Sequence, residues 1–159
     1  MNKLIIANWK MNPASQKEAE KLLVVTTKKF NTLKKIDLII CLPFPFLFLF
    51  KKNKIKKISL GSQNSHNELE GSYTGEVSPK MLVDFGVKSV IVGHGERRRL
   101  GEDDIFINHK VLSLIKNKIS PILCIGEKNR DGDGNYLSFI EDEIKKDLNG
   151  VSKAQLQNI

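Results

Sequence analysis

Residues 89–98 read SVIVGHGERR, a short apolar run that passes directly into polar and charged residues. A short apolar run that ends at a glycine is typical of a buried strand, and the GERR that follows the histidine is typical of the first turn of a helix. Four similar apolar runs lie before and after this one. Together they predict strands at residues 4–7, 37–42, 58–62, 89–93 and 121–125. Because these runs are nearly continuous, we expect a parallel sheet with both faces covered.

Helical patterns fill the intervals between the predicted strands. Each begins with a side chain that can accept a hydrogen bond from the first turn of a helix. The predicted starts are Ser15, Ser78, Asp104 and Ser138. After Ser15, the residues Leu22 and Leu23 fall on one apolar face. The alternation of strands and helices predicts an α/β fold made of parallel βαβ units, in a single domain over residues 1–159.

The spacing of the predicted strands indicates which parallel fold this is. Strand starts lie about 29 residues apart, close to the ~31 residues per unit of an eight-unit barrel of ~250 residues. The chain of 159 residues therefore holds about five units, and a closed barrel needs three more. A complete open sheet of five strands, of the doubly wound type, is the alternative that composition and periodicity leave open.

The net charge of +8 comes mostly from lysine. Only four of the 26 basic residues are arginines, and the lysines are scattered apart from a dense run at residues 51–57. Nucleic-acid binders tend to gather arginines on one face, with aromatic residues beside them in single-strand binders. A solvated lysine-rich surface is the favoured interpretation. A basic phosphate- or nucleic-acid-binding module is the alternative, and salt-dependent retention on DNA would support it.

Several classes of protein are disfavoured by the composition. No run approaches the roughly 18 apolar residues of a membrane span, and the N-terminal apolar run is too short for a signal peptide. Cys41 and Cys124 each lie within an apolar run, which favours free buried thiols in a reducing compartment. We therefore expect a cytoplasmic protein without a membrane segment. No histidine or cysteine grouping has the spacing of a metal site, and no glycine-rich nucleotide-binding motif occurs.

Polar residues follow the predicted strands at their carboxyl ends, where parallel α/β folds place their active sites. Asn8, Trp9 and Lys10 follow the first strand, and His94 follows the fourth. Lys10 can hold a phosphate or stabilise an oxyanion, although an ordinary surface lysine is the alternative. A histidine at a helix N-terminus is disfavoured as imidazolium, and the neutral ring can donate a hydrogen bond to a carbonyl. A strand-end histidine bonded to backbone is the alternative for His94.

Four segments resemble triosephosphate isomerase in their order along the chain. ANWKMN at residues 7–12 matches the signature of the first strand of that family, and GSYTGEVS at 71–78 matches its long third loop. VGHGERR at 92–98 matches its fourth-strand motif, and ILCIGE at 122–127 matches its fifth strand. The resemblance extends over essentially all 159 residues, so the expected fold is a TIM (β/α)8 barrel that is incomplete at about five units.

This resemblance implies an aldose–ketose isomerase that interconverts dihydroxyacetone phosphate and D-glyceraldehyde 3-phosphate through an enediolate. It implies a role in glycolysis and gluconeogenesis, with neither a metal nor an organic cofactor. Asn8, Trp9 and Lys10 would bind the phosphorylated triose substrate. His94 would be the electrophile, which polarises the carbonyl and moves a proton between the two oxygens, with Lys10 and Asn8 as further catalytic residues.

The same resemblance implies supporting roles for four other residues. Glu96 would pair with Lys10, while Arg97 and Arg98 would tie the loops and a subunit contact together. Thr74, at the tip of the third loop, would reach into the active site of the neighbouring subunit of a homodimer. The family has serine where this chain has Gly95, so the serine hydroxyl is missing.

The catalytic base of the family has no counterpart among residues 1–159. Its glutamate, its lid loop and its phosphate-binding glycines would all follow Ile159. Glu127, Glu141 and Glu143 do not replace it, because none lies in the base motif. Since abstraction of a carbon-bound proton requires a base within hydrogen-bonding reach, we expect the 159-residue chain to be inactive alone. The alternative is a non-catalytic fragment that pairs with another chain.

Overall fold

The computed structural model describes residues 2–53, 55–127, 130 and 132–159, so Lys54 of the dense lysine run lies outside the described residues. Five parallel strands form one sheet. They are β1 (Lys3–Asn8), β2 (Ile36–Leu42), β3 (Ser59–Ser62), β4 (Ser89–Val92) and β5 (Ser120–Leu123). All five predicted strands are confirmed, with ends that agree to within two residues.

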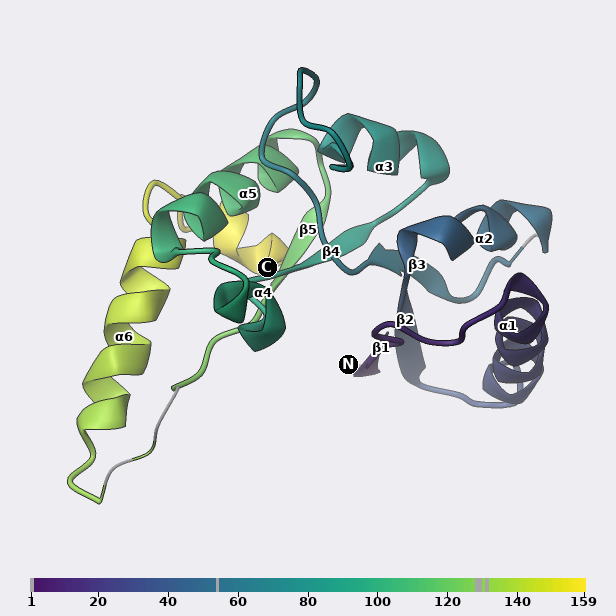
Figure 1. The fold of residues 1–159 in the computed structure, drawn as a ribbon. Coiled ribbons are helices and arrows are strands. Elements are labelled where there is room, and N and C mark those ends of the chain that lie inside the picture. The colour runs from purple at the N-terminus through teal and green to yellow at the C-terminus, as the bar shows by residue number, and fades with distance from the viewer. Residues whose placement is uncertain (1, 54, 128–129, 131) are drawn as a thin grey trace.

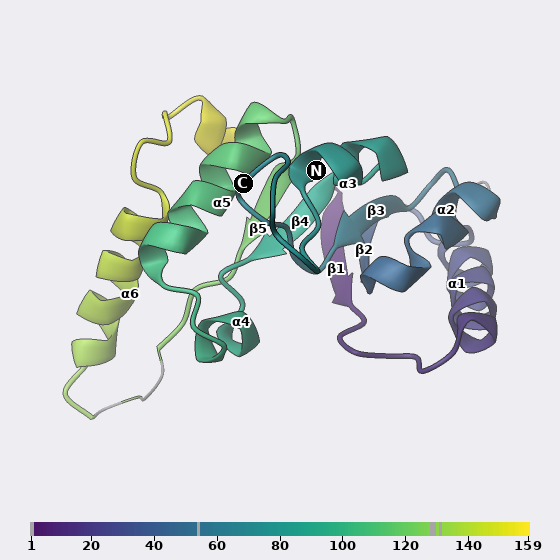
Figure 2. The same cartoon turned by 45° about the horizontal axis from the view of Figure 1, so that its top comes forward.

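The order of the strands distinguishes between the two folds that the sequence allows. Each strand pairs with the next one in the chain, so the order is β1-β2-β3-β4-β5. A doubly wound sheet reverses its strand order at one point, and this sheet does not. The doubly wound alternative is therefore wrong. The sheet curls as part of a (β/α) barrel does, with its helices following one another around the outside (Figures 1 and 2).

Six α-helices and two short 3₁₀ helices occur among the described residues. The α-helices are α1 (Gln16–Phe30), α2 (Phe48–Lys52), α3 (Pro79–Phe85), α4 (Gly95–Arg99), α5 (Asp104–Lys116) and α6 (Asn135–Asp147). The 3₁₀ helices are η1 (Phe44–Phe46) and η2 (Gln155–Asn158).

Two of the predicted helix starts are confirmed. The Ser15 hydroxyl accepts a hydrogen bond from the Glu18 backbone N–H at 3.3 Å, and Ser78 accepts one from the Met81 N–H, also at 3.3 Å. Leu22 nevertheless stays 45% exposed, so the apolar face of α1 is narrower than its pattern indicates.

The other two predicted starts are wrong. Asp103 caps α5 by accepting from the Phe106 N–H, and Asp104 is the first residue of that helix. Helix α6 begins at Asn135, ahead of Ser138, whose hydroxyl donates to the Asn135 carbonyl at 2.8 Å. Capping residues that lie close together in the sequence offer several starts, and only the backbone conformation selects one.

The hydrophobic core lies between the sheet and its helices. In β2 the alternate residues Leu38, Ile40 and Leu42 belong to this core, together with Leu23 of α1 and Val90 of β4. Both cysteines are free, as predicted, although only Cys41 is buried and Cys124 is half-buried. Burial raises the pKa of the Cys41 thiol to about 12, which suits a packing role rather than nucleophilic chemistry.

The two outer strands leave the sheet open. Among the described strands, β1 pairs only with β2, and β5 pairs only with β4. Leu4, Ile5 and Ile6 of β1 are 58%, 46% and 41% exposed. Apolar side chains of β1, β5 and α6 line an open hollow of about 580 Å³. No helix in the described part of the chain combines the length and hydrophobicity of a membrane span.

Candidate active site

A pocket of about 370 Å³ lies at the carboxyl ends of the strands. The predicted catalytic residues Asn8, Lys10 and His94 all line it, although β1 and β4 are separated in the sheet by two strands. Glu96 and Arg97 line it too, as do Gln63 and Asn64 after β3. The curl of the sheet thus brings side chains from distant parts of the sequence to one opening.

The side chains of Asn8 and Gln63 hold the backbone at Lys10 by hydrogen bonds. Lys10 has a positive φ of 56°, and the Asn8 side-chain oxygen accepts a hydrogen bond from its backbone N–H at 2.9 Å. The Gln63 side-chain amide donates to the Lys10 carbonyl at 2.8 Å and to the Cys41 carbonyl at 3.2 Å. Asn8 and Gln63 therefore fix the turn that aims the Lys10 side chain into the pocket.

The Lys10 ammonium is positioned by two residues that follow β4. Its Nζ donates to Glu96 Oε1 at 2.7 Å and lies 3.4 Å from His94 Nε2. The hydrogen bond from Lys10 is the largest of the effects that lower the pKa of Glu96. The pairing of Lys10 with Glu96 is thus present in this structure, and it holds the cation next to the histidine ring.

The orientation of His94 follows from the turn between β4 and α4. Gly93 has a φ of 70°, and a Cβ atom there would lie 2.8 Å from the Cys124 carbonyl oxygen. His94 Nδ1 then accepts a hydrogen bond from the Glu96 backbone N–H at 3.1 Å, which makes His94 the N-cap of α4. In a neutral ring this bond assigns the proton to Nε2. An ammonium and an imidazole N–H therefore converge on the pocket, an arrangement that can stabilise negative charge on a bound oxygen.

Arg98 ties the end of β4 to two helices. Its guanidinium donates to the Gly93 carbonyl at 3.0 Å, to Asp104 at 2.6 Å and to Asp147 at 2.6 Å. The Arg98 side chain is largely buried. Arg98 therefore supports the His94 turn from behind and does not line the pocket.

A buried ionic cluster lies beside the pocket, and the site predicted from the sequence did not include it. Lys110 of α5 is buried, and its Nζ donates to Asn64 Oδ1 at 2.8 Å and to Glu102. Arg97 Nε donates to the same Glu102 oxygen at 2.7 Å. Burial lowers the pKa of Lys110. A signal for this cluster exists in the sequence, because Lys110 falls on the apolar face of α5 beside the buried Ile107.

Other predicted site residues lie outside the pocket. The half-buried Trp9 packs against the hydrophobic core, and the exposed Thr74 lies in the loop of residues 63–78. Among the glutamates, Glu127 pairs with Arg130 and Glu141 with Lys145. Glu143 is buried and accepts from the Gly126 N–H at 2.9 Å. These three glutamates do not line the pocket.

Comparisons with known proteins find similar proteins over nearly the whole chain. A family model described as Triosephosphate isomerase matches residues 3–159. The triosephosphate isomerase of Natranaerobius thermophilus is 36% identical over 158 residues, which cover 98% of this chain and 61% of the relative. That of Aquifex aeolicus is 40% identical over 156 residues, covering 96% and 63%.

A solved structure gives the same result. The crystal structure of triosephosphate isomerase from Bartonella henselae aligns with a TM-score of 0.88 and 29% identity, covering all of this chain and 66% of the other. The chain thus spans 61–66% of the length of these three proteins. Because the family model matches nearly every residue, this chain belongs to the triosephosphate isomerase family.

Proposed function

We propose that Asn8, Lys10 and His94 serve the interconversion of dihydroxyacetone phosphate and D-glyceraldehyde 3-phosphate. The observation that carries this proposal is the 3.4 Å approach of Lys10 Nζ to His94 Nε2 in one open pocket. The conversion moves a hydrogen between two adjacent carbons, and the oxygens on both carbons take up negative charge on the way. A fixed cation beside a neutral N–H donor suits that charge distribution.

The chemistry assigns a separate task to each group. When a base removes the proton from the carbon next to the carbonyl, the electron pair of the broken C–H bond forms the C=C bond of an enediolate. The carbonyl oxygen becomes negative, and the positive charge of Lys10 stabilises that oxygen. His94 Nε2–H polarises the carbonyl and passes its proton to one oxygen while receiving one from the other. The C=C electron pair then takes the proton back from the base at the neighbouring carbon, which leaves the carbonyl on the other carbon. Asn8, which holds the Lys10 turn, keeps this geometry in place.

The remaining parts of the proposal come from the family resemblance. The base and the phosphate-binding loops would come from chain that follows the five βα units described here. We propose a homodimer in which Thr74 contacts the neighbouring subunit, and a cytoplasmic enzyme of glycolysis and gluconeogenesis. The geometry of the loop of residues 63–78 supports the proposal of a dimer. A hydrogen bond of 2.8 Å from the His66 N–H to the Val77 carbonyl closes the base of this loop, and Thr74 is exposed on it.

A kinetic comparison tests the role of His94. The extended chain is residues 1–159 followed by the part of the Aquifex aeolicus relative that lies beyond its matched region. In the extended chain, His94→Gln is expected to lower kcat by about 100-fold or more with little change in KM, because the polarising hydrogen bond strengthens in the transition state. His109→Gln, on the exposed side of α5, is the matched control and should leave both constants unchanged.

Two results would contradict this role. A change confined to KM would make His94 a binding residue only. Equal losses of kcat in the His94 and His109 variants would indicate damage to the fold rather than to the chemistry.

A second candidate function is supported by the open edges. Because β1 and β5 are unpaired on one side and β1 exposes Leu4, Ile5 and Ile6, residues 1–159 can also act as a non-catalytic partner that pairs with another chain. The coding sequence after codon 159 separates the candidates. An in-frame strand followed by a Glu-Pro-Val-Trp motif supports the isomerase, whereas a stop codon supports the pairing chain.

A further inference from the structure

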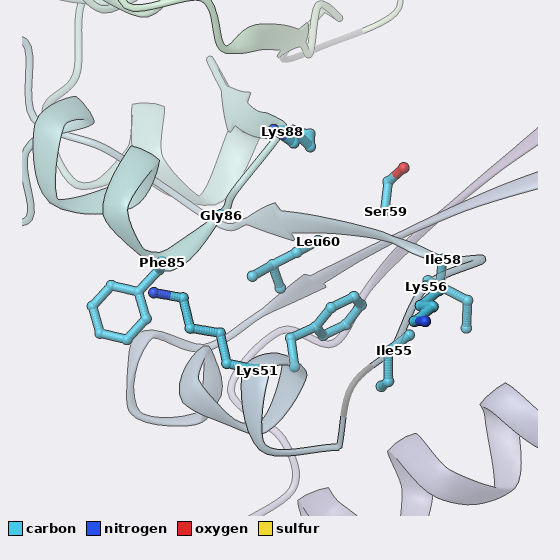
Figure 3. A pocket seen from close by; sticks show the side chains of 10 residues that line it. Lys51, Ile55, Lys56, Ile58, Ser59, Leu60, Phe85, Gly86 and Lys88 are labelled. Atoms are coloured by element: carbon cyan, nitrogen blue, oxygen red, sulfur yellow. The ribbon is translucent and has the colours of Figure 1, made fainter.

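A second pocket lies at the opposite end of the sheet from the candidate active site. It has a volume of about 490 Å³ and is formed by α2, the segment that leads into β3, and the end of α3 (Figure 3). Its floor is apolar, since Phe50, Ile58 and Leu60 are all buried. Ile55 and Phe85 form its walls. A hollow of this size and lining is within the range that binds small organic molecules.

Three lysines surround this apolar floor, and they come from three different segments. Lys51 belongs to α2, Lys56 precedes β3, and Lys88 precedes β4 (Figure 3). The Lys51 ammonium donates to the Asp84 carbonyl and lies 3.9 Å from the Asp84 carboxylate and 5.9 Å from the centre of the Phe85 ring. It is therefore held at the rim, where Asp84 partly offsets its charge.

The other two lysines carry the uncompensated charge of the rim. Lys56 and Lys88 are exposed, and within the described ranges neither has a carboxylate at ion-pairing distance. Their long side chains can extend apolar stems along the pocket wall and place the ammonium groups at its mouth. The pocket thus combines an apolar floor with a positive opening.

We propose that this pocket binds a small amphipathic anion, namely a monocarboxylate with an aliphatic tail of about eight carbons. The tail would lie on Phe50, Ile58 and Leu60, and the carboxylate would meet Lys56 and Lys88. Charge complementarity selects an anion over a neutral lipid, and the floor selects a molecule with an apolar body over a small polar anion. The site therefore differs in ligand class from the active-site pocket, which is proposed to take a phosphorylated triose.

The position of the pocket makes the proposal independent of the isomerase proposal. The pocket is built on β3, the central strand, and so lies away from the open edges of β1 and β5. Completion of the barrel or self-association through those edges would not cover it. Ligand binding is therefore measurable in the 159-residue chain itself, at concentrations below those at which it self-associates, without any catalytic readout.

Titration with octanoate is the direct test. Methyl-selective NMR on the 159-residue chain should show saturable, one-to-one shifts of the Ile58 and Leu60 signals, with a Kd of about 1 mM or tighter. Octanamide lacks the charge and acetate lacks the tail, so each should bind at least about tenfold more weakly. Raising the salt concentration should weaken octanoate binding and leave octanamide unaffected.

Charge reversal tests the lysines. Lys56→Glu and Lys88→Glu should each weaken octanoate binding about fivefold or more, whereas the matched exposed variant Lys153→Glu should have no effect. The absence of saturable shifts at Ile58 and Leu60 would overturn the proposal. Equal affinity for octanoate and octanamide would overturn it too, since binding would then be unspecific partition. Equal losses in all three variants would also overturn it, since binding would then be general charge attraction.

Discussion

At the scale of single residues, the site depends on a few backbone positions that aim side chains from different strands. The sequence pattern places Asn8, Lys10 and His94 after strands, and the structure brings them to one pocket. The Gln63 bridge to the Lys10 and Cys41 carbonyls could not be predicted, because it depends on the relative position of three strands. The burial of Lys110 was not predicted, because the chain contains so many lysines that each one is expected to be solvated.

The two glycines that flank His94 should differ sharply in their tolerance of a side chain. Gly93→Ser forces a Cβ atom to 2.8 Å from a carbonyl oxygen at a positive φ, and we expect it to lower the free energy of unfolding of the extended chain by about 1–3 kcal/mol. At Gly95 the nearest atom to an added Cβ is Arg99 NH1 at 3.8 Å. Gly95→Ser introduces the residue that the family resemblance implies at this position, and it should be neutral or stabilising by a few tenths of a kcal/mol.

Urea unfolding of both variants makes this comparison. Similar losses of stability in the two variants would show that the turn before His94 is not the constrained position. A strongly destabilising Gly95→Ser would show that the space beside α4 is occupied.

At the scale of elements, strands were easier to predict than helix starts. A buried parallel strand is a continuous apolar run, so each of the five is visible within two residues of its ends. Helix α5 begins one residue away from the predicted cap, because Asp103 and Asp104 are chemically equivalent in sequence. Helix α6 has a glycine, Gly134, in the N-cap position and therefore lacks the side-chain signal on which the prediction depended.

The burial of Asp147 in α6 makes the stability of this region depend on pH. Burial raises the pKa of Asp147 to about 6, against the opposing effect of Arg98. Because the folded-state pKa lies above the unfolded value, the protonated carboxyl favours folding. This contribution is fully present below about pH 4 and is lost as the pH rises through 6.

Replacement of Asp147 isolates this effect. The free energy of unfolding of the extended chain, relative to its Asp147→Asn variant, should fall by up to about 3 kcal/mol between pH 4 and pH 7. Asp142→Asn, on the exposed side of α6, is the control and should show the same small difference at both pH values. Urea unfolding at several pH values measures both. A stability advantage of the unaltered chain over the Asp147→Asn variant that grows as the pH rises would contradict a raised pKa for this carboxyl.

At the scale of the whole molecule, the strand order is the feature that no local pattern reveals. Strand spacing favours a partial barrel, but composition and periodicity leave a doubly wound sheet open, and the pairing of each strand with its successor decides between them. The family resemblance predicts the barrel, because its motifs recur in order along the chain. The same topology leaves two edges and an apolar inner face open.

These open edges predict how the 159-residue chain behaves in solution. Unpaired parallel strands with exposed apolar side chains favour association with other chains, so we expect self-association that depends on concentration. The extended chain, in which β1 and β5 acquire neighbours, should lose this association through its edges and form only the proposed dimer. Sedimentation velocity over a range of concentrations measures it. A sharp monomeric species of the 159-residue chain with cooperative unfolding would contradict the expectation.

Isomerase turnover, with and without the remaining units, tests the whole account most directly. The 159-residue chain, in a preparation shown to be free of host enzyme, should convert D-glyceraldehyde 3-phosphate no faster than buffer. The extended chain should turn over, and it should lose at least about 100-fold of that rate when His94 is replaced by Gln. Substantial turnover by the 159-residue chain alone, or an extended chain whose rate is indifferent to His94, would contradict the assignment of this pocket as half of an isomerase site.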